Sequence, residues 1–218
     1  MTFHPRILPF GESALLVELA DDIDERAIVR ARVIADAWER LGVGAAVPAY
    51  GSVVLSFGGR LTPKEAELCA REILNSAGDA GSVDAAIVGD SASRIVEIPT
   101  HYDGEDLAEV AAMSTLSVDE LIALHSGREY TAFFLGFLPG WAYCGQVDPR
   151  IKAPRLPSPR PRIAPGTVAV IDGQTGVYSF PSPGGWRLIG STDAVMFDPA
   201  REQPSLLRAG DRVRFVPR

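Results

Sequence analysis

Three polar residues in one glycine-flanked turn have the chemistry to hold a small polar ligand: Gln174, Thr175 and Tyr178. An amide and two hydroxyls on a short loop offer both donors and acceptors, so together they can bind an amide, a lactam or a carboxylate. We therefore expect them to contact a small-molecule substrate. The alternative is an ordinary hairpin turn with an exposed Gln, because the flanking Gly173 and Gly176 fit both interpretations.

Three arginines precede this turn in a proline-rich segment: Arg155, Arg160 and Arg162. A guanidinium is a planar fork that matches a carboxylate or a phosphate, and a stiff backbone lowers the cost of ordering it. We expect Arg160 and Arg162 to hold the carboxylate of a substrate or a partner protein. The alternative is a solvated basic loop that pairs with the acidic surface of the protein itself.

His125 is the strongest titratable candidate, and we expect it to act as a catalytic acid, base or orienting group. It ends a predicted helix, where the macrodipole also favours His, so a purely structural role stays open. Cys144 would need a nearby cation or base to become a nucleophile. We expect it instead to pack as a small buried hydrophobe.

Glycine, proline and aromatic residues surround these candidates across residues 133–192. The dense segments read GFLPGWAYCG, PRLPSPRPRIAPG and DGQTGVYSFPSPGGWRLIGST. Gly and Pro build stiff, irregular loops, and the interleaved aromatic residues argue against disorder. The SPGGW segment at residues 182–186 sets backbone N–H groups beside an aromatic side chain, which suits a shaped cleft.

Alternating helix and strand patterns run through the first hundred residues and must support this region. Thr62, Pro63 and Glu65 give three agreeing signals for the start of a helix that Gly78 would end. An earlier helix is expected between a cap at Asp24 and Gly42. The order β-α-β-β-α-β is that of a ferredoxin-like domain. The expected strands cover residues 13–19, 45–47, 52–57 and 94–99.

Beyond residue 104 the pattern changes to two short helices followed by strands. The first helix is expected over residues 105–113, and a capping box from Ser117 to Glu120 begins the second, which ends near His125. Several short strands with two helices favour a closed or nearly closed β-barrel. The sequence therefore predicts an α+β protein with domains at residues 1–92 and 93–218. The expected barrel strands cover residues 131–137, 167–171, 177–180, 187–189, 194–197 and 212–216.

Composition is that of a soluble globular protein, with 46% hydrophobic and 22% charged residues among 218. A net charge of −7 argues against a nucleic-acid partner, and two cysteines imply no disulfide framework. We expect a cytoplasmic protein without a membrane span, since neither a leader nor a long apolar run is evident. The sequence has no Walker A loop, HExxH or paired CxxC, so neither a phosphate-binding loop nor a metal site is expected.

Four sequence segments resemble the allophanate hydrolase subunit 1 family: GFLPGWAYCG, P-R-x-R-I-A-P-G, GQTGVYSFPSPGGW and the closing AGDRVRF. The similarity runs nearly end to end, from FGESALLVEL to Phe215. The resemblance implies a cyclophilin-like barrel for the second domain. His125, Arg160 and Arg162 match residues of the family pattern, whereas Cys144 stands where that pattern has an apolar residue.

The activity that this resemblance implies first is that of the B subunit of a prokaryotic ATP-dependent 5-oxoprolinase. In that system the A, B and C subunits together open 5-oxo-L-proline to L-glutamate. The chain would pair with the C subunit, the homologue of the other carboxyltransferase half, and would be inactive alone. ATP would be used by the assembled complex, because this chain has no recognisable nucleotide motif. Two alternatives stay open: a Kip-type inhibitor of a histidine kinase, and half of a biotin-dependent carboxyltransferase of the urea carboxylase type.

Overall fold

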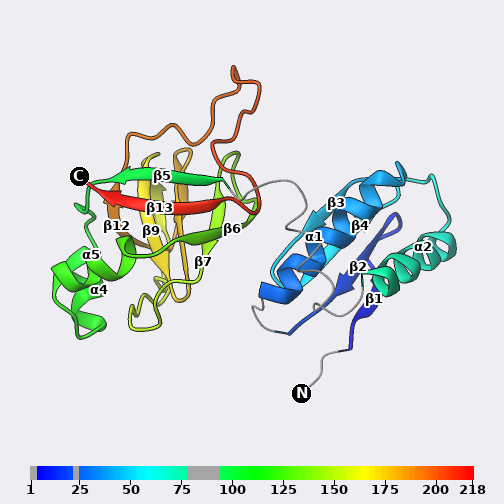
Figure 1. The fold of residues 1–218 in the computed structure, drawn as a ribbon, viewed down its shortest axis with the longest axis horizontal. Coiled ribbons are helices and arrows are strands. Elements are labelled where there is room, and N and C mark those ends of the chain that lie inside the picture. Colours follow the sequence, from blue (N-terminus) through cyan, green and yellow to red (C-terminus); the bar gives the residue numbers. More distant parts are fainter. Residues whose placement is uncertain (1–3, 22–24, 78–93) are drawn as a thin grey trace. The chain divides into compact units, whose positions relative to one another are not determined.

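The computed structural model describes residues 4–21, 25–77 and 94–218, and the chain divides into two compact units, Met1–Ala92 and Ser93–Arg218 (Figure 1). Each unit has its own hydrophobic core. The expected helix cap at Asp24 and the expected helix end at Gly78 lie outside the described residues. Within the described part, no helix combines the length and the apolarity needed to cross a membrane.

The first unit is an antiparallel sheet in the order β1-β2-β4-β3, with two helices packed on it. On β2 and β4, Leu15, Val17, Val53 and Leu55 are buried and alternate with partly exposed neighbours, so one face of the sheet carries the core. Both helices bury apolar residues against that face, with Trp38 fully enclosed. The elements are β1 (Arg6–Pro9), β2 (Ala14–Glu18), α1 (Glu25–Arg40), β3 (Ala46–Pro48), β4 (Ser52–Ser56) and α2 (Pro63–Ser76).

The capping signals at the start of α2 are confirmed. The Thr62 hydroxyl accepts from the backbone N–H of Glu65, while the Glu65 carboxylate accepts from the backbone N–H of Thr62 at 2.8 Å. Two of the orphan N–H groups at the helix start are satisfied in this way.

One strand predicted for the first domain belongs to the other sheet, so this prediction was wrong. The strand expected at residues 94–99 is β5 (Ile95–Thr100), which pairs in parallel with β13 (Arg212–Pro217) and so belongs to the second unit. The edge beside β2 is instead taken by β1. That strand is four residues long, is mostly exposed and ends in Pro9, so it lacks the alternation that marks a strand in sequence.

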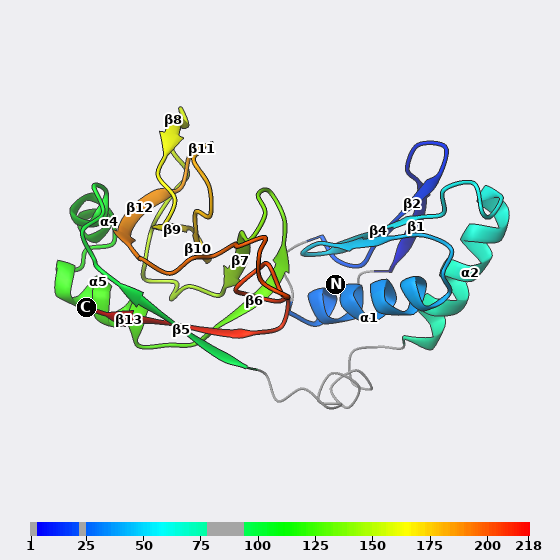
Figure 2. The same cartoon turned by 90° about the horizontal axis from the view of Figure 1, so that it is seen from above.

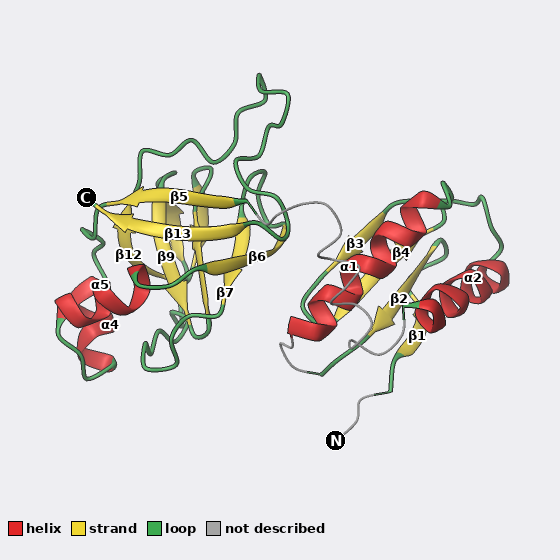
Figure 3. Cartoon of the chain, viewed as in Figure 1, coloured by secondary structure: helices red, strands yellow, loops and turns green. Residues whose placement is uncertain are grey.

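The second unit confirms the predicted class, a seven-stranded and nearly closed barrel with two helices (Figures 2 and 3). The strand order is β12-β9-β10-β7-β6-β13-β5. The two end strands meet at one bridge, where His101 and Ser191 exchange backbone hydrogen bonds of 2.8 Å. The remaining elements are α4 (Leu107–Met113), α5 (Val118–Ser126), β6 (Tyr130–Leu135), β7 (Ala142–Gly145), β8 (Arg160–Ile163), β9 (Thr167–Ile171), β10 (Gln174–Val177), β11 (Ser182–Gly184) and β12 (Arg187–Ser191).

Helices α4 and α5 lie together at one end of the barrel (Figure 1). The predicted capping box of α5 is confirmed, since Ser117 and Glu120 satisfy each other's backbone N–H groups. Strands β8 and β11 pair outside the barrel and form a short two-stranded ribbon, which projects from the barrel in Figure 2. This ribbon and the loops next to it supply most of the candidate site.

Two of the predicted barrel strands differ from the structure. The strand expected at residues 177–180 is displaced, because β10 begins at Gln174 and ends at Val177. Residues 194–197 form no strand and make only a single bridge, between Phe197 and Ser205. Strands β8 (RPRI) and β11 (SPG) consist mostly of Pro, Gly and Arg, and β7 (AYCG) has only four residues, so neither hydrophobic alternation nor propensity indicated them.

Candidate ligand-binding cleft

A cleft of about 660 Å³ opens on the barrel unit, within the size range of small-molecule sites. It lies where the GFLPGW loop, the proline-rich segment, the β9–β10 turn and the β11–β12 loop converge. Most of its lining is aromatic, proline or glycine, with few charged groups. The lining residues are Phe137, Trp141, Tyr143, Pro154, Arg155, Pro159, Ile171, Asp172, Gln174, Tyr178, Pro183, Gly184, Gly185 and Trp186.

Trp141 is the centre of the aromatic wall. Its ring lies 4.7 Å from that of Tyr178, 5.0 Å from that of Trp186 and 5.7 Å from that of Phe137, measured between centroids. The contacts are tilted or edge-on, which is the favoured geometry for aromatic pairs. Gly176 lies beneath the indole, and a Cβ there would come within 3.0 Å of it. Trp141 and Tyr178 are each 1% exposed and so form the packed interior of the wall, whereas the more exposed rings of Phe137 and Trp186 are the surfaces that a ligand can contact.

Two consecutive tight turns shape the GFLPGW loop. The N–H of Leu138 donates to the carbonyl of Gly136 at 2.8 Å, which makes Phe137 the centre of a three-residue turn with φ of +67°. The N–H of Trp141 then donates to the carbonyl of Leu138, across a Pro and a Gly140 with φ of +78°. Pro followed by a positive-φ Gly is the pattern of a type II turn.

Tyr178 faces the cleft with its hydroxyl against the β11–β12 loop. A Cβ at Gly184 would lie 2.1 Å from the hydroxyl oxygen, so only glycine leaves room for this tyrosine. Burial raises the pKa of Tyr178, and a hydrogen bond with the backbone of Trp186 opposes that rise. The hydroxyl is therefore protonated at neutral pH and acts as a hydrogen-bonding group, not as a base.

Of the predicted substrate contacts, Gln174 and Tyr178 line the cleft, whereas Thr175 does not. Side chains alternate across a strand, so the neighbour of Gln174 on β10 points into the barrel. Thr175 is fully buried there, and its hydroxyl donates to the carbonyl of Ala169 at 3.0 Å.

His125 is fully buried beside Thr175, inside the barrel and away from the cleft lining. Its Nδ1 lies 2.8 Å from the hydroxyl of Tyr102, and its Nε2 lies 2.9 Å from that of Thr175. Because Thr175 already donates to Ala169, we assign the proton to Nε2, with Tyr102 donating to Nδ1. Desolvation lowers the pKa of His125 to about 3, so the imidazole is neutral. Both ring nitrogens are satisfied, which favours the structural role that the sequence left open.

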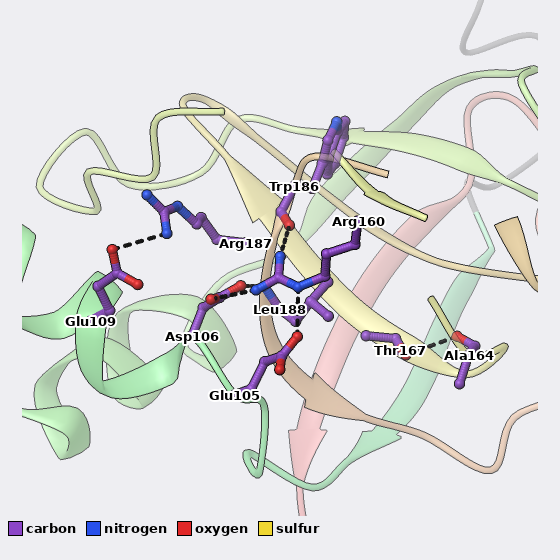
Figure 4. Close-up of polar contacts among 9 residues, drawn as sticks. All are labelled: Glu105, Asp106, Glu109, Arg160, Ala164, Thr167, Trp186, Arg187 and Leu188. Atoms are coloured by element: carbon purple, nitrogen blue, oxygen red, sulfur yellow. Dashed lines mark hydrogen bonds and ion pairs between the residues drawn. The ribbon is translucent and has the colours of Figure 1, made fainter. Parts of the chain in front are cut away.

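Arg160 is held by acidic residues at the start of α4 (Figure 4). Its guanidinium contacts the carboxylates of Glu105 at 2.6 Å and Asp106 at 2.7 Å. The second oxygen of Asp106 accepts from the backbone N–H of Leu188 at 2.7 Å, so one buried carboxylate joins α4, β8 and β12. Arg160 therefore ties strand β8, at the rim of the cleft, to the start of α4 and does not line the cleft. Arg162 is exposed on β8 and is not among the lining residues.

Two charged residues that line the cleft are not among the expected contacts: Arg155 and Asp172. Asp172 has the sequence pattern of a turn residue, and Arg155 is not one of the two arginines that match the family pattern. The spacing of three arginines in one proline-rich loop does not tell which of them faces a ligand. Cys144 is buried, and desolvation raises the pKa of its thiol to about 12, as its expected packing role requires.

The two-unit α+β architecture and the cleft on a barrel define a carboxyltransferase-type module. The chain belongs to the family described as "Carboxyltransferase domain, subdomain C and D", which it matches over residues 5–207.

Three bacterial relatives are named as the B subunit of 5-oxoprolinase. The identity is 51% over 126 residues with that of Bacillus subtilis, 49% over 128 residues with that of Escherichia coli O157:H7 and 41% over 132 residues with that of Haemophilus influenzae. These matches cover 56%, 57% and 59% of this chain. The chain spans 52% to 62% of the length of these curated relatives.

Solved structures share the fold over nearly the whole chain. TTHA0988 is 38% identical with a TM-score of 0.79, covering 94% of this chain and 40% of its own. The uncharacterized protein PH0987 from Pyrococcus horikoshii is 37% identical with a TM-score of 0.56, covering 98% of this chain and 97% of its own. Urea carboxylase from Kluyveromyces lactis is 19% identical with a TM-score of 0.76, covering 98% of this chain and 22% of its own, and shows the fold alone.

Proposed function

We propose that this chain acts as the B subunit of an ATP-dependent 5-oxoprolinase and binds 5-oxo-L-proline in the cleft. The observation that carries the proposal is the identity of 41% to 51% with three proteins of that name. The matches cover part of each relative, so the activity of the whole assembly is inferred from a shared region.

The chemistry of the cleft supports this substrate. 5-Oxo-L-proline is a small, nearly flat lactam ring that carries one carboxylate. The aromatic wall around Trp141 suits the faces of such a ring, and the amide of Gln174 can both donate to and accept from a lactam. Arg155 supplies a positive charge at the same cleft.

The lining set supports a division of labour within an assembly. Among the described residues that line the cleft, Asp172 is the one carboxylate and none is a His. Opening an unactivated lactam requires activation of the amide and positioned charge at the reacting atoms. We infer that ATP and the remaining catalytic groups come from the A and C subunits, and that the complex works in the cytoplasm, where ATP is available.

The lengths of the structural relatives support an obligate partner. A chain equivalent to this one makes up 40% of TTHA0988 and 22% of the yeast urea carboxylase. In those proteins the module is one part of a longer polypeptide. We infer that the C subunit is the direct partner of this module.

The test is reconstitution of the three-subunit complex. We expect glutamate and ADP to be released from 5-oxo-L-proline and ATP by the mixture of the A, B and C subunits, and by none of them alone. Omitting this chain should abolish release. A mixture that hydrolyses 5-oxoproline at the same rate without this chain contradicts the proposal. Binding to a histidine kinase, or carboxyl transfer from a biotinyl carrier in place of glutamate release, would favour the two alternative activities.

A further inference from the structure

Arg155 differs from the other arginines around the cleft in its ionic contacts. Arg160 is paired with two carboxylates, and Arg187 contacts the carboxylate of Glu109 at 3.0 Å. Among the described residues, no carboxylate lies within ion-pair distance of Arg155, although the protein has a net charge of −7. The cleft therefore contains a guanidinium that the described part of the chain does not neutralise.

The backbone on both sides of Arg155 is held in place. The N–H of Ala153 donates to the carboxylate of Asp172 at 2.7 Å, and the carbonyl of Pro154 accepts from the guanidinium of Arg187 at 3.1 Å. On the other side, the N–H of Leu156 donates to the carbonyl of Gly185 at 2.8 Å. These bonds fix the direction of the backbone at Arg155, which directly follows Pro154. Arg155 is solvent-exposed, but its backbone is held on both sides, so ordering it on an anion costs less conformational entropy than ordering an arginine in a flexible loop.

The side chain of Arg155 lies over Gly185. A Cβ at this glycine would come within 3.2 Å of Nε and 3.3 Å of Cγ of Arg155. The stem of the arginine therefore occupies the space that a side chain at position 185 would need. Its charge also reaches the cleft wall, since it lowers the pKa of both Tyr143 and Tyr178 against the rise caused by burial.

We propose that Arg155 is the ligand-binding residue that holds a carboxylate, and that the cleft selects flat, monoanionic small molecules. A carboxylate fits the planar guanidinium fork. A dianion such as phosphate is disfavoured because Asp172 lines the same cleft. The identity of the ligand as 5-oxo-L-proline rests on the proposed function, whereas the requirement for one carboxylate rests on Arg155.

Arg155 takes the role of carboxylate ligand that the sequence analysis gave to Arg160 and Arg162. Arg160 would have to break ion pairs with Glu105 and Asp106 to reach a ligand. Arg162 is exposed outside the cleft lining.

Binding is measured through the fluorescence of Trp141 and Trp186, which line the cleft, in the full chain. The probes are 5-oxo-L-proline, 2-pyrrolidinone, which is the same ring without the carboxylate, and inorganic phosphate. We expect Arg155→Gln to weaken 5-oxoproline binding about tenfold or more, the range for loss of a charge-assisted hydrogen bond. Lys152→Gln removes the same charge from an exposed site in the same segment and should change affinity less than about twofold. Arg162→Gln should behave like Lys152→Gln.

The lactam without a carboxylate should bind wild type and Arg155→Gln with equal, weaker affinity, and phosphate should bind neither. Equal binding of 5-oxoproline and 2-pyrrolidinone to wild type, or unchanged affinity of Arg155→Gln, overturns the inference. If the isolated chain binds none of the probes, the same variants are compared by KM for 5-oxoproline in the three-subunit complex. There an unchanged KM for Arg155→Gln overturns it.

Failure of this inference is distinguishable from failure of the proposed function. A complex that releases no glutamate, with carboxylate binding that still depends on Arg155, refutes the function and keeps the carboxylate site. A complex that releases glutamate equally well with Arg155→Gln refutes the site and keeps the function.

Discussion

Phe137 combines a strained backbone with a largely solvent-exposed aromatic ring at the cleft. Its φ of +67° lies in the left-handed region, and its side chain is 58% exposed although it lines the cleft. A bulky residue in this conformation costs on the order of 1–3 kcal/mol. Burial of the ring recovers little of this cost, so we infer that the conformation serves to hold the ring edge-on to Trp141, where a ligand can contact it.

The strain at Phe137 can be separated from the loss of the ring by two substitutions. Phe137→Gly and Phe137→Ala both remove the ring, but only Gly adopts a positive φ freely. We expect the free energy of unfolding of Phe137→Gly to be about 1 kcal/mol higher than that of Phe137→Ala. Both should bind 5-oxoproline more weakly than wild type. Equal stability of the two variants in urea denaturation would show that position 137 is unstrained.

Gln174 and Thr175 are sequence neighbours with opposite environments, so they form a matched pair. Gln174→Ala should lower turnover of the assembled complex by about tenfold while leaving stability nearly unchanged. Thr175→Val should destabilise the chain by about 1–3 kcal/mol, because it removes the hydrogen-bond partner of the buried His125 Nε2 and one donor to the carbonyl of Ala169. The melting temperature and glutamate release are measured for each. A loss of stability in Gln174→Ala, together with a loss of turnover alone in Thr175→Val, would place Thr175 and not Gln174 at the substrate.

His125 makes stability depend on pH in a defined direction. Its folded pKa of about 3 lies below the ordinary value of 6.5, so the unfolded chain takes up the proton first. The contribution of the neutral imidazole is therefore complete above pH 6.5 and is lost as the pH falls from 6.5 toward 3. Between about pH 7 and pH 5 we expect a loss of about 2 kcal/mol in the free energy of unfolding.

The control for this pH dependence is His125→Gln, which lacks the titrating ring. The difference in pH dependence between wild type and variant isolates His125 from the other two histidines. If His125 is structural, the pH profile of glutamate release by the complex should keep its shape in the variant. If the rate of glutamate release no longer falls on one side of the pH optimum in His125→Gln, His125 acts as an acid or a base in the reaction.

At the scale of elements, α4 acts as a brace for the ribbon that forms the cleft rim. Asp106 is buried and joins Arg160 of β8 to the backbone of Leu188 on β12. Glu109 on the same helix pairs with Arg187, but its side chain is 57% exposed. The two carboxylates therefore make similar contacts at very different degrees of burial.

Asp106→Ala should destabilise the chain by about 2–3 kcal/mol, because it leaves Arg160 with one carboxylate partner, the exposed Glu105, and removes the acceptor of the Leu188 N–H. Glu109→Ala removes an exposed carboxylate but leaves the side chain of Arg187, which is 9% exposed, with the carbonyl of Pro154 as a remaining partner, so it should cost less than Asp106→Ala, about 1 kcal/mol. Both values come from chemical denaturation of the full chain. A loss at Asp106 no larger than that at Glu109 would contradict the bracing role.

The sequence predicted the elements whose signals are local. The capping boxes at Thr62 and Ser117 begin helices where expected, and β9 (Thr167–Ile171) has the predicted bounds. Strand β1 was missed because it is short and mostly exposed and shows no hydrophobic alternation, although it pairs with the next strand. The ribbon strands were missed because they exist through pairing across about twenty residues, which no local pattern records. For the same reason β5 was assigned to the wrong sheet, since its partner β13 lies more than a hundred residues further along the chain.

The candidate site shows the same limit. Gln174 and Tyr178 were predicted from residue type, and both line the cleft. The choice among Arg155, Arg160 and Arg162 depended on where Glu105 and Asp106 lie, 54 or more residues earlier in the chain. His125 was singled out because it precedes the strand that leads into the GFLPGW loop, yet its side chain is fully buried and does not line the cleft.

At the scale of the whole molecule, the chain is a module whose described cleft residues do not form a complete set of catalytic groups. In TTHA0988 the equivalent region is 40% of a longer chain. A binding cleft on one module and reactive groups on others would require assembly for turnover. We therefore propose that this chain contributes a substrate cleft to a multi-subunit 5-oxoprolinase.

The most direct test measures glutamate release from 5-oxo-L-proline and ATP by the A and C subunits, with and without this chain. We expect release to require this chain and to fall when Gln174 or Arg155 is substituted in it. Release at the full rate in the absence of this chain, or full release with the doubly substituted Arg155→Gln, Gln174→Ala chain, would contradict it.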